Sequence, residues 1–109
     1  MEIKEKIAKI ADTYGYDAQS RQCIEEMAEL TQAINKFWRK VLKCGRNHEI
    51  QVVKCNNNLF FPKEHDNLIE EIADVQIMLW QMEHLLGADI TPIVEKKLNR
   101  QIGRIEDKI

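Results

Sequence analysis

The segment that most constrains the fold is residues 66–86, which predict a helix that is apolar around almost its whole circumference. At about 100° per residue, Leu68, Met78 and Met82 fall on one side of this helix. The opposite side carries four further apolar residues, Ile69, Ala73, Ile77 and Trp80. A helix that is apolar all round is normally buried, so other helices or a second copy of the chain must cover it.

The first half of the chain has the same helical periodicity. Residues 2–14 repeat apolar side chains at helical spacing, and Gly15 ends that segment. Asp17 or Ser20 can cap a second helix that runs to about Lys43. Two helices are therefore expected before the chain reaches its first irregular stretch.

The second half predicts two more helices. Asp66 is an N-cap for the helix that ends before Gly87, and Thr91-Pro92 opens a helix that continues toward the C-terminus. With 109 residues the chain fits one domain, residues 1–109. We expect an all-α fold, a four-helix bundle.

Residues 44–65 differ from the rest of the chain. Gly45, the run Asn56-Asn57-Asn58 and Pro62 interrupt helical periodicity, and two β-prone patches flank the asparagines. A short β-hairpin and a loop are both consistent with this insert.

Charge and composition exclude several function classes. The formal net charge of -2, from 16 basic and 18 acidic residues, gives no general attraction to a nucleic acid polymer or an acidic membrane. No apolar run reaches the roughly 18 residues of a membrane span, and the N-terminus lacks the apolar core of a secretory signal. Three cysteines without a framework suit reduced thiols, so we expect a cytoplasmic protein.

Two similar segments, EEMAEL at 25–30 and EEIADV at 70–75, carry pairs of carboxylates. Glu26 and Glu29 are three residues apart, as are Glu71 and Asp74, so each pair lies on one face of its helix and repels. A divalent cation with oxygen ligands would remove that repulsion.

Glu71 is the most informative of these carboxylates, because its neighbours on the helix face include Met78 and Met82. A buried carboxylate costs on the order of several kcal/mol unless it is paired or bound to a metal. Glu26 and Glu29 lie largely opposite the apolar stripe expected for their helix, where a solvated acidic strip is an equal alternative.

With these motifs the sequence resembles the MazG-like, all-α nucleotide pyrophosphohydrolases, whose signature is ExxE followed by ExxD. The resemblance extends over EEMAELTQAINKFWRK, EEIADVQIMLWQM and KLNRQIGRI, roughly residues 20–43 and 66–105. The stretch between the two motifs is longer than the family usually has, and the insert at 44–65 accounts for the excess.

The resemblance implies a MazG-like bundle that hydrolyses a nucleoside triphosphate, a deoxynucleotide or a non-standard one, between the α and β phosphates. The products are the monophosphate and pyrophosphate. Magnesium, with manganese as a substitute, would be held by four carboxylates, Glu26, Glu29, Glu71 and Asp74. Glu25 or Glu70 could orient the attacking water as a base, and the sequence does not choose between them.

Basic residues are candidates for binding the phosphates. Lys36 and Arg39 follow the first acidic pair, and Lys97, Arg100 and Arg104 form a strip on the last helix. A solvated face explains these residues equally well, and the resemblance favours Lys97 and Arg100.

Aromatic residues could form a wall for the nucleobase. Trp38 and Trp80 are the candidates, although their helical spacing favours a place in the core. Phe60 and Phe61 in the insert are alternatives, as a lid or an arm toward a partner.

Other polar residues have structural interpretations. A zinc site is disfavoured because its ligand spacing matches no familiar module; the residues would be Cys44, His48, Cys55 and His65. Cys23 is expected to be a small buried residue, and His84 to interact with a helix C-terminus.

Two other functions remain open, a non-catalytic helical interaction module and a nucleotide sensor that has lost turnover. The position of Glu71 among apolar residues argues against the first, and the presence of all four motif carboxylates argues against the second. The amount of apolar surface predicts a homodimer or a dimer of dimers.

Overall fold

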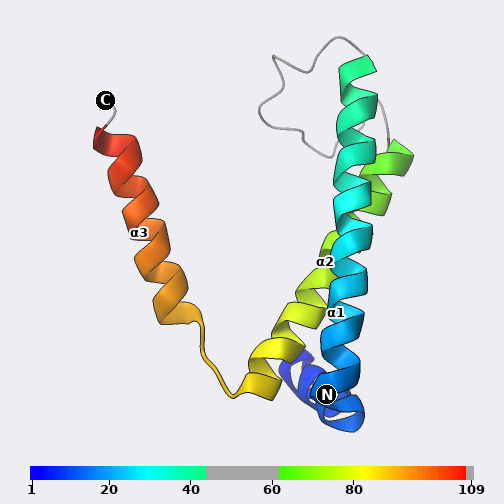
Figure 1. Ribbon diagram of the computed structural model, residues 1–109, viewed down its shortest axis with the longest axis vertical. Helices are drawn as coiled ribbons and strands as arrows, with labels where there is room; N and C mark the ends of the chain where they lie inside the picture. Colours follow the sequence, from blue (N-terminus) through cyan, green and yellow to red (C-terminus); the bar gives the residue numbers. More distant parts are fainter. Residues whose placement is uncertain (44–61, 108–109) are drawn as a thin grey trace.

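The computed structural model describes residues 1–43 and 62–107, and this part of the chain is all-α, with no strand. It contains three helices: α1 (Ile3–Lys43), α2 (Pro62–Leu86) and α3 (Thr91–Asp107) (Figure 1). In these ranges, no helix has the length and apolar character needed to cross a membrane. The all-α prediction is confirmed, whereas three helices are assigned where four were expected.

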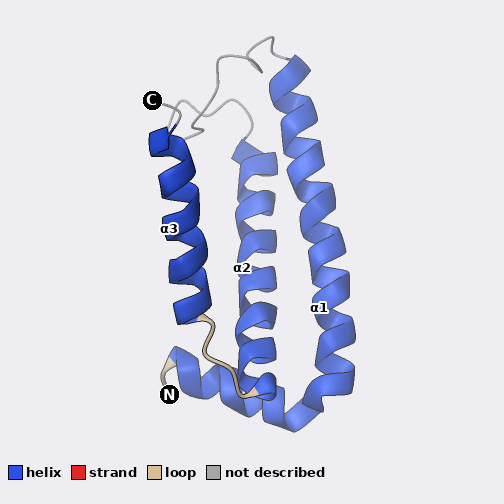
Figure 2. Cartoon of the chain, turned by 60° about the vertical axis from the view of Figure 1, so that its left-hand side comes forward, coloured by secondary structure: helices blue, strands red, loops and turns tan. Residues whose placement is uncertain are grey.

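The difference in number comes from Gly15. The two helices expected on either side of it are one helix, α1, with a kink at Gly15, where φ is 82° and ψ is 171°. Only glycine adopts this backbone conformation readily. The kink turns the N-terminal arm, residues 3–14, across the end of α2 (Figure 2). Asp12 Oδ1 and His84 Nε2 are 2.8 Å apart and connect the arm to α2.

The long part of α1 and α2 form an antiparallel pair. Residues near the start of one helix contact residues near the end of the other: Gln19 bonds Gln81, and Lys40 pairs with Glu64 over 3.8 Å. Side chains in this contact are buried or half-buried and recur at alternating steps of three and four residues, as in a coiled coil. We call this contact the seam. Its α1 residues are Gln19, Cys23, Glu26, Leu30, Ala33, Phe37 and Lys40, and its α2 residues are Glu64, Leu68, Glu71, Val75, Met78, Met82 and Leu85, with the buried Gln81 at its edge, bonded to Gln19.

The start of α2 lies earlier than the sequence suggested. Asp66 was expected to cap the helix, but α2 begins at Pro62, so residues 62–65 belong to the helix and not to the insert. Proline is compatible with the first turn of a helix, which explains why it does not act as a breaker here. The other residues of the expected insert, 44–61, lie outside the described part, and with them the expected hairpin or loop.

The end of α2 is a regular cap. Gly87, with φ at 62°, donates its N–H to the His84 carbonyl, and Ala88 donates to the Glu83 carbonyl, each at 3.1 Å. His84 lies in the last turn of α2, as predicted. Two residues after this cap, Asp89 Oδ1 accepts a hydrogen bond from the Thr91 N–H at 3.0 Å and starts α3.

Helix α3 stands apart from the other two. It packs against neither α1 nor α2, and none of its residues, 91–107, is buried (Figure 1). Its apolar residues nevertheless form one stripe, Val94, Leu98, Ile102 and Ile105. Gly103 does not end the helix, and the predicted bundle that includes this helix is not closed within one chain.

Candidate metal site

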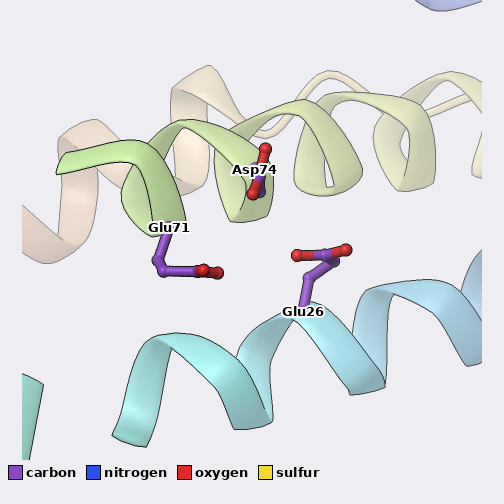
Figure 3. Close-up of side chains that lie close together, drawn as sticks. All are labelled: Glu26, Glu71 and Asp74. Atoms are coloured by element: carbon purple, nitrogen blue, oxygen red, sulfur yellow. The ribbon is translucent and has the colours of Figure 1, made fainter. Parts of the chain in front are cut away.

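Three carboxylates converge in the seam, at the middle of the α1–α2 pair. Glu26 comes from α1, and Glu71 and Asp74 come from successive turns of α2 (Figure 3). One carboxylate oxygen of each residue lies within 4.8 Å of the others. The structure therefore brings together three of the four carboxylates that the sequence predicted as metal ligands.

The heptad positions explain why these groups meet. Glu26 and Glu71 both occupy seam positions, which in a coiled coil are normally apolar. Asp74 lies one turn after Glu71, so its side chain is displaced toward one edge of the seam and is exposed. Glu29 has the equivalent position one turn after Glu26 and is also exposed.

Two oxygen atoms in this cluster are buried without a partner. Within the described residues, Glu26 Oε2 and Glu71 Oε2 are shielded from solvent and form no hydrogen bond. The other oxygen of Glu26, Oε1, accepts a hydrogen bond from Gln22 Nε2 at 2.9 Å. Buried carboxylate oxygens without hydrogen bonds are uncommon, because the lost hydration is not replaced.

The pKa values of two carboxylates in this region are raised. Burial, followed by the charges of Asp74, Glu26 and Glu70, raises the pKa of Glu71 above its ordinary value of 4.5. The pKa of Glu29 is raised chiefly by the charge of Glu26 and then by burial. None of the ion pairs formed by the described residues involves a carboxylate of this cluster.

The donor set fits a hard divalent cation. Mg²⁺ and Ca²⁺ prefer carboxylate oxygens, and a cation would supply the partner that Glu26 Oε2 and Glu71 Oε2 lack. Asp74 at the exposed edge leaves one side of the cluster accessible to a ligand.

One expectation about α1 is wrong. Glu26 was placed opposite the apolar stripe of its helix, but it lies half-buried in the seam. The large apolar residues Ile24, Met27 and Ile34 of the same helix are instead 63%, 42% and 49% exposed. Smaller and polar side chains fill part of the seam instead, so hydrophobicity alone selected the wrong side of α1.

The two candidate bases are not directed into the cluster. Glu25 and Glu70 are both exposed, and each is adjacent in sequence to a seam carboxylate, hence about 100° around its helix. Glu70 is near enough for its charge to raise the pKa of Glu71.

The basic candidates lie on two different helices. Lys36 and Arg39 are exposed on α1, beyond the acidic cluster. Three others, Lys97, Arg100 and Arg104, are exposed on α3, which the chain does not bring against the cluster.

The tryptophans do not occupy the core of the chain. Trp38 and Trp80 are 58% and 42% exposed. Trp80 lines an apolar groove of about 410 Å³ between the N-terminal arm and α2, where it lies beside Ile3 and Ile77. Trp80 lies far from the seam positions around α2, so it faces the N-terminal arm of α1 and not the carboxylates.

Only some of the residues that were given a structural interpretation lie in the described part of the chain. Cys23 is buried, as predicted. His65 is buried against Phe37, with ring centroids 6.1 Å apart. Cys44, His48 and Cys55, as well as Phe60 and Phe61, lie outside the described residues.

Sequence reasoning missed Gln22, which orients Glu26 by its hydrogen bond. The four-residue spacing of the two side chains on one helix was the available signal.

Comparisons with protein families, with curated proteins and with solved structures found no match to this chain.

Proposed function

We propose that this chain is a magnesium-dependent nucleoside triphosphate pyrophosphohydrolase that releases a monophosphate and pyrophosphate. The observation that carries the proposal is the pair of buried, unpartnered oxygens of Glu26 and Glu71 beside Asp74. An ordinary solvated acidic surface does not account for them, because such a surface leaves its carboxylates in water.

The residues have distinct roles in this proposal. Glu26, Glu71 and Asp74 hold the metal, and Glu29 joins them from the exposed edge, where its carboxylate already lies near that of Glu26. Bound Mg²⁺ would neutralise phosphate charge and make a coordinated water more acidic. Gln22 holds the Glu26 carboxylate in place through its 2.9 Å hydrogen bond. Glu25 and Glu70, which are exposed beside the cluster and not directed into it, remain the candidates for the base that accepts the proton of the attacking water.

Among the basic residues, Lys36 is the best placed to meet a phosphate. It follows Glu29 by seven residues, which is about two helical turns or roughly 10 Å along the same side of α1. Arg39 is rotated away from that side by about 60° relative to Lys36. Lys97, Arg100 and Arg104 remain candidates that depend on where α3 docks, and Trp38 and Trp80 remain candidates for the base.

The test is a product analysis with a panel of nucleoside triphosphates and Mg²⁺ or Mn²⁺. Glu71→Gln keeps the shape of the side chain and removes a ligand charge. Glu95→Gln is the matched control, because it makes the same chemical change at an exposed position on α3, away from the cluster. We expect monophosphate and pyrophosphate from the wild type and the control, and loss of both in Glu71→Gln and with a chelator.

A metal titration separates the alternatives. Metal binding without cleavage of any nucleotide would favour a sensor, and nucleotide affinity would then be measured directly. Absence of both metal binding and cleavage would leave a helical interaction module and would refute the proposed reaction. Release of inorganic phosphate in place of pyrophosphate would retain the metal site but change the bond that is cut.

A further inference from the structure

The N-terminal arm, residues 3–14, is held across the end of α2 by a small apolar contact (Figure 2). Within the arm, Ile7 and Ala11 are buried, whereas Ile3 and Ile10 are 66% and 40% exposed. A helix shorter than about 12–15 residues is only marginally stable in water by itself, so the arm depends on its docking. Because little apolar surface anchors the arm, one polar contact can change the fraction of molecules in which it is docked.

The arm makes a direct polar contact with α2 through Asp12 and His84. Asp12 Oδ1 and His84 Nε2 are 2.8 Å apart, and both side chains are partly exposed. A neutral imidazole can donate an ordinary hydrogen bond to this carboxylate, whereas an imidazolium forms a charge-assisted bond that is roughly twice as strong. Histidine side chains ordinarily change charge at about pH 6.5, so the strength of this contact changes near neutral pH.

The charged groups around His84 are mostly acidic. It lines an open cavity of about 740 Å³ together with Lys4 and Glu5 of the arm, Glu83 of α2 and Asp89 of the following turn. His84 also lies in the last turn of α2, where the helix dipole favours a cation. A positive charge on His84 therefore meets carboxylates and the negative end of a helix, and Lys4 is the cation that opposes it.

The arm also reaches the turn from which α3 starts. The pKa of Asp89 is lowered below its ordinary value of 3.8, chiefly by hydrogen bonding from Thr91 and more weakly by the charge of Lys4. Lys4 is thus close to the carboxylate that accepts the Thr91 N–H at the beginning of α3. A docked arm supports this turn, and an arm that leaves α2 removes Lys4 from it.

We infer that the N-terminal arm is a pH-sensitive strap, docked on the end of α2 when His84 is protonated and released more often when His84 is neutral. Gly15, with φ at 82°, is the hinge between the arm and the long part of α1. Exposed ion pairs and charges at helix ends have small effects, so protonation should favour the docked arm by roughly fivefold. Docking is therefore strongest in mildly acidic solution and weakens as pH rises through the range in which histidine loses its proton. Release opens the apolar groove that the arm forms with α2 beside Trp80.

Hydrogen exchange of the arm amides, followed by mass spectrometry, measures how often the arm leaves α2. Protection factors are corrected for the effect of pH on intrinsic exchange and are compared at pH 5.5 and pH 8. We expect the protection of residues 3–14 to fall by roughly fivefold between these two values. Circular dichroism at both pH values shows which proteins are folded.

Substitutions at the two ends of the contact separate charge from hydrogen bonding. His84→Lys stays positive at both pH values, so its arm should remain protected at both. His84→Gln keeps a hydrogen-bond donor without the charge, so its arm should be as weakly protected at pH 5.5 as that of the wild type at pH 8. Asp12→Asn should behave like His84→Gln. Asp17→Asn is the matched control and should behave like the wild type, because it makes the same chemical change at an exposed residue that pairs with Arg21 on the same helix.

Three results would overturn the inference. The first is wild-type arm protection that does not change between pH 5.5 and pH 8. The second is a loss of protection in folded His84→Lys as large as in the wild type, because another group would then be titrating. The third is a folded Asp12→Asn variant with the pH dependence of the wild type. The measurement needs neither metal nor nucleotide, so its outcome is independent of the proposed enzymatic function.

Discussion

Gln19 Nε2 donates a hydrogen bond of 2.8 Å to Gln81 Oε1, and both side chains are buried in the contact between α1 and α2. This amide pair lies on the side of the cluster toward the kink at Gly15. A buried polar pair in a helical seam favours one alignment of the helices, since any other alignment leaves amides without partners. The alignment it favours is the one in which Glu26 faces Glu71.

Replacing one member of this pair should destabilise the fold. Gln81→Leu leaves the buried amide of Gln19 without its acceptor, and we expect a loss of about 1–3 kcal/mol in the free energy of unfolding. Urea denaturation measures this change. The double variant Gln19→Leu/Gln81→Leu should recover most of the loss, because both polar groups are then removed. A double variant as unstable as the sum of the two single variants would show that the hydrogen bond has no role.

Magnesium should stabilise the fold through the seam carboxylates. A cation at 100 times its Kd adds about 2.7 kcal/mol to the free energy of unfolding, which raises the melting temperature by several degrees. Glu71→Gln should melt higher than the wild type without metal, because a repulsive charge is gone, and should lose most of the increase with Mg²⁺. Thermal melts with Mg²⁺ and with chelator test both statements, and Glu95→Gln should behave as the wild type does.

The metal-free protein should lose stability as pH rises above about 4.5. The pKa values of Glu29 and Glu71 are raised in the folded chain, so the folded state holds protons that the unfolded state has released. The associated stability is fully present below the unfolded value of 4.5 and is lost as pH rises through the higher folded values. Melting temperatures of the wild type and of Glu29→Gln/Glu71→Gln, compared between pH 4 and 8, isolate the effect. The wild type should fall relative to the variant as pH rises, and a constant difference would contradict this.

Gly15 and Gly103 should respond oppositely to alanine. At Gly15 the backbone conformation is one that alanine adopts only with strain, so Gly15→Ala should cost about 1–3 kcal/mol. Gly103 lies inside α3 with nothing within 4 Å of an added methyl group, so Gly103→Ala should stabilise by roughly 0.5–1 kcal/mol. Chemical denaturation of the two variants provides the comparison. Equal effects would mean that the kink at Gly15 is not maintained in solution.

The sequence predicted the helical character of the chain because the periodicity is strong, and it located the break at Gly15 because glycine is needed there. The sequence also assigned Glu71 and Asp74 to one site, because residues three apart on a helix project from the same face. The start of α2 was misplaced because Pro62 was interpreted as a breaker, although a first helical turn accepts proline.

The seam of α1 could not be identified by hydrophobicity. Ile24, Ile34 and Trp38 look like core residues, yet Gln19, Ala33 and Lys40 occupy the contact with α2. A helix with two competing stripes does not reveal which one its neighbour in the same chain covers. The helix that packs against α1 determines which stripe is covered, and that contact joins residues far apart in the sequence.

The seam also determines which changes of chain length this protein can accept. Insertion or deletion of one residue between Gln19 and Lys40 would rotate all following positions by about 100°. Glu29 would leave the side of α1 on which it lies next to Glu26, and exposed apolar residues such as Ile34 would turn toward the seam or to another side of the helix. A substitution alters one position at a time, whereas a single-residue insertion or deletion disturbs both the metal ligands and the Gln19–Gln81 alignment. Length variation among related chains should therefore avoid this segment, or occur there in steps of seven.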